Sequence, residues 1–435
     1  MDDFIKEFKA KVKSKRLKIA VVGLGYVGLP LAMEFAKKGF SVLGVDLDKD
    51  RVSQLKRKVS YITDISSSEI KKVTDLEKFR AVFSFNLLKQ ADVVFICVPT
   101  PLKRKYQPNI SYITSAVSSI SRNRKEKALI VLESTTYPGT TEEIILPMLE
   151  KDGSRHGEDF YLCFSPERID PGSSFSLRGI PKVVGGIDRL AGELTADVYR
   201  AIFDKVVPVS SARVAEMVKL LENTFRLINI GLIDELAMMA HAMGIDIFEV
   251  INAAKTKPFG FMPFYPGPGV GGHCIPKDPL YLYWKAKHHG FSSRFIKLAS
   301  DVISGMPGYV IMRVKAELKK SGVPLNKARI LIVGVTYKRD VRDLRKSPAL
   351  DIIELLRKAK ANVSYHDPLI PYLKVLNFNL KSIKLDSGVI GGFDCIIIVT
   401  DHAVIDYKFL QKNARLIFDT RNVYGGVKDR KIIRI

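Results

Sequence analysis

The sequence contains few cysteines and no long apolar run, and each absence excludes a class of protein. Its four cysteines, Cys97, Cys163, Cys274 and Cys395, include no CxxC pair and no His/Cys ligand spacing, so neither a disulfide framework nor a metal site is predicted. The longest apolar runs have the length of a strand, whereas a membrane span needs roughly 20 apolar residues. The N-terminus lacks the apolar segment and cleavage site of a signal peptide. We therefore expect a cytoplasmic protein without membrane insertion.

Acidic residues are also scarce relative to basic ones. The 435 residues include 69 Lys and Arg against 46 Asp and Glu, which gives a formal net charge of +23. Clustered basic residues can indicate nucleic-acid binding, but these are spread along the chain without an RNA-recognition, zinc-finger or basic-zipper pattern. The densest run, Lys6 to Lys18, is typical of a solvated helix face with Ile5, Phe8 and Val12 on its apolar side. We expect a field that attracts small anions, and no nucleic-acid partner.

A glycine-rich turn joins a strand to a helix near the start of the chain. An apolar strand, Ile19 to Val22, leads into GLGYVG at residues 23–28, and a second strand ends at Asp46, 23 residues after the first glycine. In a dinucleotide-binding turn, the first glycine allows the bend, the second lets a pyrophosphate approach, and the third lets the helix pack on the strand. Asp46 would accept hydrogen bonds from an adenosine ribose and repel a 2′-phosphate, which favours NAD over NADP. The alternative is a strand–helix turn without a ligand.

Strands and helices continue to alternate to about residue 207, which predicts a doubly wound α/β domain. Polar loops follow several of its strands, where open sheets of this kind bind ligands. Such loops are CVPTP at residues 97–101, the stretch containing Thr135, and SPER at residues 165–168 with Glu167. A threonine hydroxyl there suits a substrate or water contact, or alternatively turn chemistry, and Thr140 or Thr141 is a plausible cap for the next helix.

One long helix is predicted from Arg213 to Met243, because apolar residues recur at helical spacing. Lys219 and Asn223 lie four residues apart and so point from one face, among apolar neighbours. A Lys and an Asn on a helix edge are usually only exposed, which is the alternative to a functional role. A helix of this length between two α/β halves suits a domain bridge or a dimer contact.

A second glycine-rich stretch runs from Tyr265 to Leu282. It has four glycines in six residues, followed by Cys274 and Asp278. Glycines at this density let a backbone approach a ligand closely, and a cysteine at the end of such a loop is placed like a nucleophile. The alternative is a surface turn with a helix beginning at Asp278-Pro279.

A second α/β unit begins at residues 328–335. Its first turn, GVTYKR at residues 334–339, lacks the GxGxxG pattern and is rich in basic residues, which predicts a Rossmann-like domain for a different phosphate-bearing ligand. The predicted fold is therefore α/β, with two Rossmann-like doubly wound domains joined by a long central helix and a helical middle domain. The predicted domains are residues 1–207, 208–312 and 313–435.

Several motifs in one order resemble the UDP-glucose/GDP-mannose dehydrogenase family over residues 17 to 427. They are GLGYVGLP (23–30), CVPTP (97–101), EST and PGTT (within 133–141), SPER (165–168), EMVKLLENTFR (216–226), GVGGHCIPKDP (269–279) and GVTYKRDVRDLRKSPALDI (334–352). The resemblance implies an NAD-dependent oxidoreductase that converts the C6 alcohol of a UDP-sugar to a carboxylate in two oxidations. It also implies a cysteine thiohemiacetal and thioester, a first domain for NAD, a last domain for the UDP-sugar, and a homo-oligomer.

The resemblance further implies roles for individual residues. Lys219, Asn223 and Asp278 would surround the reacting oxygen, Cys274 would be the nucleophile, and Glu167 would be the general base for thioester hydrolysis with Thr135 as a positioning group. The implied NAD contacts are Gly23, Gly25, Tyr26, Val27, Gly28, Asp46, Arg51, Val98, Pro99, Thr100, Pro101, Thr135 and Arg345. The implied substrate contacts are Glu167, Arg168, Lys219, Asn223, Tyr265, Gly269, Gly271, Lys338 and Arg421.

The choice of sugar depends on one loop. His273 and the lead-in at residues 256–269 resemble the branch that acts on UDP-N-acetylhexosamines, and the lead-in is more similar to enzymes for UDP-N-acetylglucosamine than to those for UDP-N-acetylmannosamine. Lys277 departs from that branch and matches the glucose branch, so UDP-N-acetylmannosamine and UDP-glucose stay open as substrates. A nucleotide-sugar binding protein without catalysis is the alternative from another class, although the residues implied in catalysis are all present.

Overall fold

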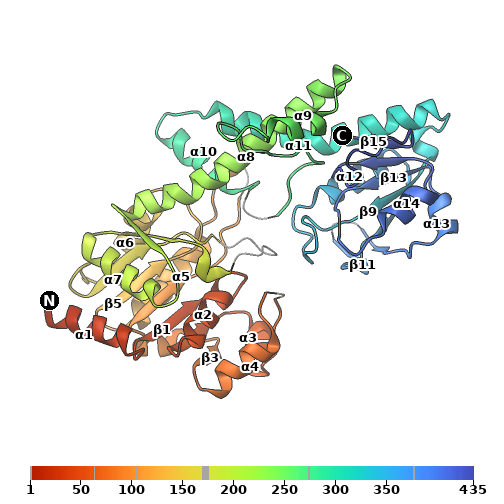
Figure 1. The fold of residues 1–435 in the computed structure, drawn as a ribbon. Coiled ribbons are helices and arrows are strands. Elements are labelled where there is room, and N and C mark those ends of the chain that lie inside the picture. Colours follow the sequence, from red (N-terminus) through yellow and green to blue (C-terminus); the bar gives the residue numbers. More distant parts are fainter. Residues whose placement is uncertain (1, 63, 104–105, 169–175, 273–274, 376–377) are drawn as a thin grey trace. The chain divides into compact units, whose positions relative to one another are not determined.

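The computed structural model describes residues 2–62, 64–103, 106–168, 176–272, 275–375 and 378–435 (Figure 1). The chain divides into two compact units. The first comprises Met1–Glu222 with Trp284–Phe291, and the second comprises Asn223–Tyr283 with Ser292–Ile435. Each unit is built on its own sheet. The division into three domains at residues 207 and 312 stays a prediction.

The sheet of the first unit has eight strands in the order β3-β2-β1-β4-β5-β6-β7-β8. Neighbouring strands run parallel except β6 and β7, which are antiparallel. Its central strands are short apolar runs, as expected of a sheet that is covered on both faces. The strands are β1 (Lys18–Val22), β2 (Ser41–Val45), β3 (Phe79–Val82), β4 (Val93–Ile96), β5 (Ala128–Leu132), β6 (Phe160–Phe164), β7 (Lys182–Gly186) and β8 (Val206–Val209).

Helices cover both faces of this sheet. One face shares its apolar core with α2, α3, α4 and α7, and the other with α5 and α6. The doubly wound arrangement predicted for this part of the chain is confirmed. The helices are α2 (Gly28–Lys37), α3 (Lys49–Lys56), α4 (Ser67–Asp75), η1 (Phe85–Gln90), α5 (Ser111–Asn123), η3 (Thr141–Ile145), α6 (Leu146–Glu150), η4 (Leu177–Gly179) and α7 (Arg189–Arg200).

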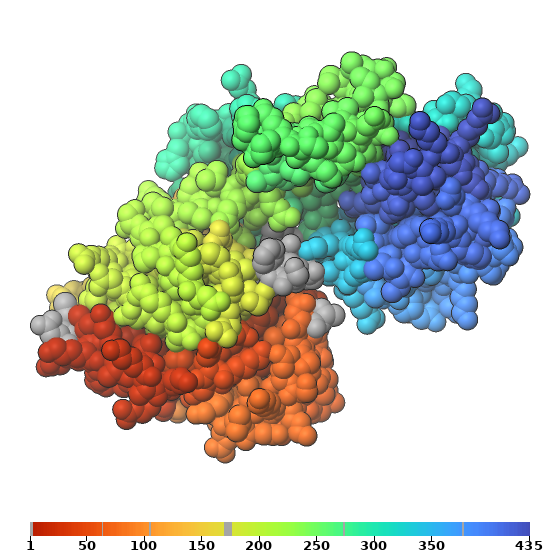
Figure 2. Space-filling view, viewed as in Figure 1, coloured from red at the N-terminus to blue at the C-terminus, as the bar shows by residue number. Residues whose placement is uncertain are grey.

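The basic N-terminal segment forms helix α1 (Asp2–Lys13), which packs on the first unit. Phe8 is buried in the core, and Phe4 stacks on Tyr161 with ring centroids 5.4 Å apart. Lys9 lies 3.7 Å from Asp197 on α7. The apolar face of α1 is thus occupied by its own domain, and the N-terminal residues form part of the outer surface of this unit (Figure 2).

The second unit contains a five-stranded parallel sheet in the order β10-β9-β13-β14-β15. Helices α11 (Arg294–Lys320) and α12 (Pro348–Lys358) share the core of one face, and α13 (Ser387–Gly391) and α14 (Tyr407–Asn413) that of the other. The second Rossmann-like sheet is therefore confirmed. Its strands are β9 (Arg329–Val333), β10 (Asn362–His366), β13 (Cys395–Ile398), β14 (Ile417–Asp419) and β15 (Ile432–Arg434), and β11 (Tyr372–Leu373) pairs with β12 (Leu380–Lys381) beside them.

The predicted long helix is α8 (Ala212–Ala242), within one residue of the expected bounds. Helices α9 (Ile247–Ala254), α10 (Asp278–His288) and α11 complete the helical middle of the chain. The large apolar side chains of α8 are only partly covered: Val214, Met217, Leu221, Phe225, Leu232 and Met239 are 39–58% exposed. Over the described ranges, no helix is long and apolar enough to cross a membrane.

Candidate active site

The glycine turn after β1 shows which of its glycines the fold itself requires. Gly23 has a φ of +92°, and a Cβ there would lie 2.6 Å from the carbonyl oxygen of Cys97. A Cβ on Gly28 would lie 1.9 Å from the carbonyl oxygen of Gly23, whereas a Cβ on Gly25 would meet nothing within 4 Å. Folding therefore needs Gly23 and Gly28, and Gly25 leaves open space at the start of α2. That space suits a phosphate-bearing cofactor.

Asp46, at the end of β2, fixes the same turn. Its Oδ2 accepts from the backbone N of Leu24 at 2.8 Å, and its Oδ1 accepts from the backbone N of Asp48 at 2.9 Å. Arg51 on α3 lies 3.5 Å from Oδ2, while the hydroxyl of Tyr61 donates to the carbonyl of Leu24. The carboxylate is thus oriented before any ligand binds, which suits the predicted contact with a ribose.

The loops after β4 and β5 are joined to each other. The hydroxyl of Thr100 donates to the carbonyl of Thr135 at 2.7 Å, and that of Ser134 donates to the carbonyl of Ile96 at 3.2 Å. The predicted NAD contacts at residues 98–101 and the predicted positioning group Thr135 therefore lie together at the carboxyl edge of the sheet.

Glu167 follows β6 and is buried beside Lys219 of α8. The Nζ of Lys219 lies 3.5 Å from Oε2 of Glu167 and also donates to its backbone carbonyl. Burial raises the pKa of the Glu167 carboxyl, and the positive charges of Lys219 and Lys182 oppose that rise. A carboxyl whose pKa is raised by burial becomes a stronger base when it is ionised, which suits the predicted general base.

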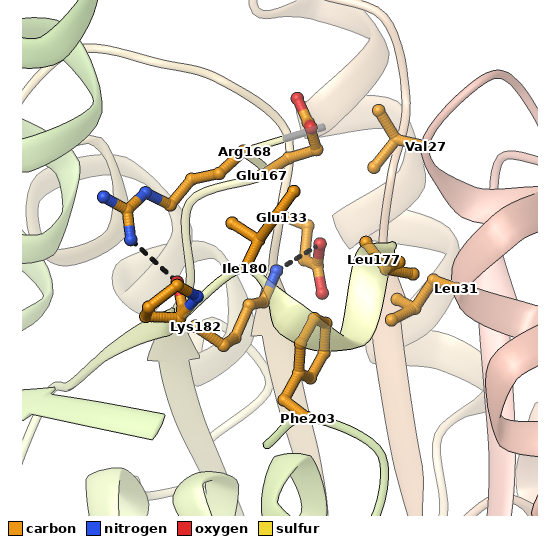
Figure 3. A pocket seen from close by; sticks show the side chains of 10 residues that line it. Val27, Leu31, Glu133, Glu167, Arg168, Leu177, Ile180, Lys182 and Phe203 are labelled. Atoms are coloured by element: carbon orange, nitrogen blue, oxygen red, sulfur yellow. Dashed lines mark hydrogen bonds and ion pairs between the residues drawn. The ribbon is translucent and has the colours of Figure 1, made fainter. Parts of the chain in front are cut away.

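A pocket brings part of the glycine turn to this carboxylate. Val27 of the turn, Glu167 and Arg168 line it together with Leu177, Lys182 and Phe203 (Figure 3). Arg168 turns its guanidinium to the carbonyl of Pro181 at 2.7 Å and to Glu222 of α8. Its predicted contact with the substrate stays a prediction.

A buried acid on α8 replaces a predicted helix cap. Glu216 accepts from the backbone N of Gly139 at 2.6 Å and of Thr141 at 2.9 Å, and from the Thr141 hydroxyl at 2.7 Å. The hydroxyl of Thr140 instead donates to the carbonyl of Tyr137. The prediction that Thr140 or Thr141 caps this helix was wrong, because an acid 75 residues away takes the N–H groups. A charge inside the apolar pattern of α8 was the available signal.

The second unit places Asn223 and Asp278 in contact. Asn223 lies one turn after Lys219 on α8, and its Nδ2 donates to Oδ2 of Asp278, the first residue of α10, at 2.7 Å. Both side chains are buried. Asp278 thus bonds a side chain on another helix, and its predicted role in catalysis stays a prediction. Cys274, the predicted nucleophile, and His273 lie outside the described residues.

The glycines before Cys274 pack closely on their own unit. A Cβ on Gly271 would lie 2.6 Å from Cβ of Tyr337, and Gly269 has a φ of +122°. The backbone N of Gly272 donates to the carbonyl of Arg345 at 2.9 Å. These positions therefore need glycine because their backbone packs closely against the turn after β9. The predicted approach of a sugar would be a second reason.

Asp234 of α8 holds the start of the same stretch, a contact that sequence reasoning missed. Its Oδ1 accepts from the backbone N of Gly267 at 3.0 Å, and its Oδ2 has no hydrogen-bond partner among the described residues. Burial raises the pKa of Asp234 to about 7, although the hydrogen bond from the N–H of Gly267 and the positive charge of Arg421 both lower it.

The remaining predicted ligand contacts belong to the second unit. Arg421 donates through Nε to the carbonyl of Val399 at 2.7 Å. The carbonyl of Lys338 accepts from the Thr336 hydroxyl at 3.0 Å. Arg345, predicted for NAD, forms an ion pair with Asp343 at 2.6 Å, and Tyr265 is 46% exposed. Their ligand roles stay predictions.

Known proteins match this chain along nearly its whole length. Models of the UDP-glucose/GDP-mannose dehydrogenase family match residues 17–203 (NAD binding domain), 213–303 (central domain) and 331–426 (UDP binding domain). A Pseudomonas aeruginosa protein named UDP-N-acetyl-D-glucosamine 6-dehydrogenase is 38% identical over 395 residues, which cover 89% of this chain and 91% of that relative.

Solved structures of related dehydrogenases also resemble the fold. The UDP-D-ManNAc dehydrogenase of Pyrococcus horikoshii is 34% identical with a TM-score of 0.88, over 96% of this chain and 99% of that one. The NDP-N-acetyl-D-galactosaminuronic acid dehydrogenase of Methanosarcina mazei is 27% identical with a TM-score of 0.82, over 98% and 97%.

Proposed function

The chain belongs to the UDP-glucose/GDP-mannose dehydrogenase family and is an NAD-dependent UDP-sugar 6-dehydrogenase, and we propose that its substrate is UDP-N-acetylglucosamine. The product would be the corresponding uronate. The observation that carries the proposal is the 38% identity to a relative named for that sugar. The resemblance of the lead-in at residues 256–269 to enzymes for the same sugar supports it.

The residues of the first unit fit NAD. Gly25 leaves open space at the helix start, and Asp46 is already oriented by two backbone N–H groups. We assign the cofactor to this turn, to residues 98–101 and to Thr135. Bound there, NAD would accept a hydride from C6 of the sugar in each of the two oxidations, so that two NAD are consumed per substrate.

Lys219, Asn223 and Asp278 would act on the oxygen at C6. The hydroxyl proton would pass to ordered water held by these residues, and Lys219, an ammonium donor, can stabilise the negative charge that develops on the oxygen. Asn223 is held by Asp278 through its Nδ2, which leaves its amide oxygen to accept from the hydroxyl or from an ordered water.

Cys274 would carry the second half of the reaction. Its thiolate adds to the carbon of the aldehyde, and the oxygen takes a proton to give a thiohemiacetal. Loss of the second hydride from that carbon to the cofactor, and of the hydroxyl proton to water, would leave a thioester. Glu167 would then take a proton from water, with Thr135 positioning this water, as the hydroxide attacks the thioester and expels the thiolate.

The substrate contacts are proposals of the same kind. Arg168, Tyr265, Gly269, Gly271, Lys338 and Arg421, with Glu167, Lys219 and Asn223, would contact the UDP-sugar. Lys277, where the chain departs from the acetylhexosamine branch, is buried, and its Nζ lies 3.8 Å from Asp278 and 5.2 Å from the ring of Tyr281. The positive charge of Lys277 therefore lies beside the Asp278 carboxylate and is not exposed to solvent.

UDP-N-acetylmannosamine is the second candidate, because a 34% identical structure with a TM-score of 0.88 is named for that sugar. A substrate panel separates the candidates. We expect kcat/KM, read from NADH absorbance, to be highest for UDP-N-acetylglucosamine, lower for its manno epimer and lowest for UDP-glucose. A preference for either of the other two sugars would replace the substrate assigned here and keep the chemistry.

We also infer a homo-oligomer. The partly exposed apolar residues of α8, which include Leu221, Phe225 and Leu232, support an assembly in solution. Light scattering coupled to size exclusion should give a mass of at least twice 48.7 kDa, and a mass equal to one chain would contradict it.

A further inference from the structure

A buried pair of opposite charges lies behind Glu167 in the first unit. Lys182 begins β7 and Glu133 directly follows β5, and their side chains are only 6% and 2% exposed. The Nζ of Lys182 lies 2.8 Å from Oε2 of Glu133 (Figure 3). Burying such a pair contributes little net stability, because the loss of hydration offsets the attraction. Stability is therefore a weak explanation for these two charges.

The pair connects the two loops that carry proposed site residues. Lys182 also donates to the carbonyl of Pro166 at 3.2 Å, and Pro166 directly precedes Glu167. Glu133 lies two residues before Thr135. One ammonium group thus ties the carboxyl end of β5 to the carboxyl end of β6. Losing it would release the backbone that places the Glu167 carboxylate.

Each member of the pair has further contacts besides its partner. The hydroxyl of Tyr199 donates to Oε1 of Glu133. The rings of Tyr199 and Phe203 lie 4.9 Å and 5.6 Å from Nζ of Lys182, within the range of a cation–π interaction. If Lys182 is replaced, Glu133 keeps the hydrogen bond from Tyr199, and if Glu133 is replaced, Lys182 keeps its contacts with the two aromatic rings. The two charges can be changed one at a time.

The charges around Glu167 come from several elements. Lys219 of α8 and Lys182 of β7 favour the ionised carboxylate, and Glu133 after β5 disfavours it. The Cys97 thiol after β4 is also near enough to feel the charge of Glu167. Arg168, the next residue, has its guanidinium bound to Glu222.

We propose that Lys182 and Glu133 are positioning residues for Glu167: Lys182 anchors the Pro166 carbonyl, and the two charges together set the field in which the Glu167 carboxylate works. The inference rests on the proposed role of Glu167 as the general base. Lys182 and Glu133 then act on thioester hydrolysis with opposite signs, although they form one ion pair.

The direct test is the titration of Glu167 in the full-length protein. Glutamate labelled with ¹³C at the carboxyl group gives a signal that Glu167→Gln identifies by its loss. Lys182→Met should raise the titration midpoint of Glu167 by about half a pH unit or more, and Glu133→Gln should lower it by a similar amount. Lys127→Met removes one positive charge at the opposite end of β5 and should leave the midpoint unchanged. Equal shifts in all variants, or shifts of one sign in both pair variants, would overturn the proposal.

Turnover gives the second measurement. The double variant Lys182→Met with Glu133→Gln removes both charges and keeps the volume, so it avoids leaving one buried charge without its partner. The two charge effects on Glu167 cancel in this variant, but the anchor of the Pro166 carbonyl is also lost. The variant should therefore accumulate enzyme with the sugar bound as a thioester, seen as added mass on the intact protein. Lys182→Arg keeps a donor for that carbonyl and should turn over without that accumulation. A double variant that hydrolyses as fast as wild type would contradict the proposal. If the wild type oxidises no UDP-sugar, the proposed function fails, and the titration still decides whether the pair controls Glu167.

Discussion

Asn223 donates a hydrogen bond from Nδ2 to Oδ2 of Asp278 over 2.7 Å, although 55 residues separate them in the chain. The contact joins α8 to the first residue of α10, four residues after the predicted nucleophile Cys274. The bond orients the Asn223 amide, so that its oxygen faces away from Asp278.

Asn223→Ala should lower kcat about 100-fold, because the oxygen at C6 loses a positioned partner while the fold keeps its helices. Asn229→Ala is the matched control: Asn229 lies further along α8, is half-buried, and donates to the carbonyl of Phe225 in its own helix. Initial rates of NADH formation measure both. Equal losses in the two variants would assign the effect of Asn223→Ala to the helix and remove Asn223 from the site.

Two glycine variants separate cofactor binding from folding. Gly25→Ala should keep the melting temperature of wild type, because its Cβ would meet no other atom of the protein. It should weaken NAD binding at least tenfold, because the same Cβ would occupy the space that the pyrophosphate needs. Gly28→Ala should lower the melting temperature, since its Cβ would lie 1.9 Å from the carbonyl oxygen of Gly23. Thermal unfolding and a fluorescence titration with NAD read the two effects. Unchanged NAD affinity in Gly25→Ala would move the cofactor away from this turn.

Cys274→Ser should form no uronate, because a serine hydroxyl is a far weaker nucleophile toward the aldehyde than a thiolate. Cys395→Ala is the control, since Cys395 is buried in β13 and burial raises the pKa of its thiol well above the usual range. Mass spectrometry of the sugar after long incubation distinguishes them. Uronate formation by Cys274→Ser would exclude the covalent route.

Asp234→Asn should change how stability depends on pH. Burial raises the pKa of Asp234 to about 7, whereas an unfolded aspartate titrates near 3.9, so the folded protein binds the extra proton between these values. The free energy of unfolding of wild type therefore falls as pH rises from about 4 to 7 and loses this dependence above 7. Asn keeps an oxygen for the backbone N of Gly267 and cannot titrate.

The stability advantage of Asp234→Asn over wild type should consequently grow by more than about 1 kcal/mol between pH 4 and pH 8, because one pKa unit corresponds to about 1.4 kcal/mol. Urea unfolding at both pH values measures it. Asp301→Asn, an exposed carboxylate on α11 of the same unit, should show no such growth. A constant or shrinking difference for Asp234→Asn would mean that Asp234 is already ionised at low pH.

The elements that sequence reasoning predicted well depend on local pattern. The glycine turn, the alternation of strands and helices, and the length of α8 follow from periodicity and from residues within 30 positions of one another. Gly23 has the positive φ of a bend and Gly25 has open space around it, while their contacts with a cofactor stay predictions.

The buried charges depend on contacts between distant segments and could not be read in the same way. Lys182 contacts Glu133, 49 residues away, because β7 runs antiparallel to β6 and so begins where β5 and β6 end. The alternation of strands and helices in the sequence does not predict this reversal. Asp234 and Glu216 each stand in an apolar helical pattern, and that mismatch was a usable signal. The sequence did not indicate the partners of these two acids, because Asp234 and Glu216 each accept from a backbone N–H, which almost any residue can supply.

The stoichiometry of NADH formation tests the central claim most directly. A limiting amount of UDP-N-acetylglucosamine, incubated to completion with the wild-type protein and excess NAD, should give two NADH per sugar and convert all of the sugar to its uronate. One NADH per sugar with an aldehyde product would contradict the thioester route. No NADH with this sugar, its manno epimer or UDP-glucose would contradict the account as a whole.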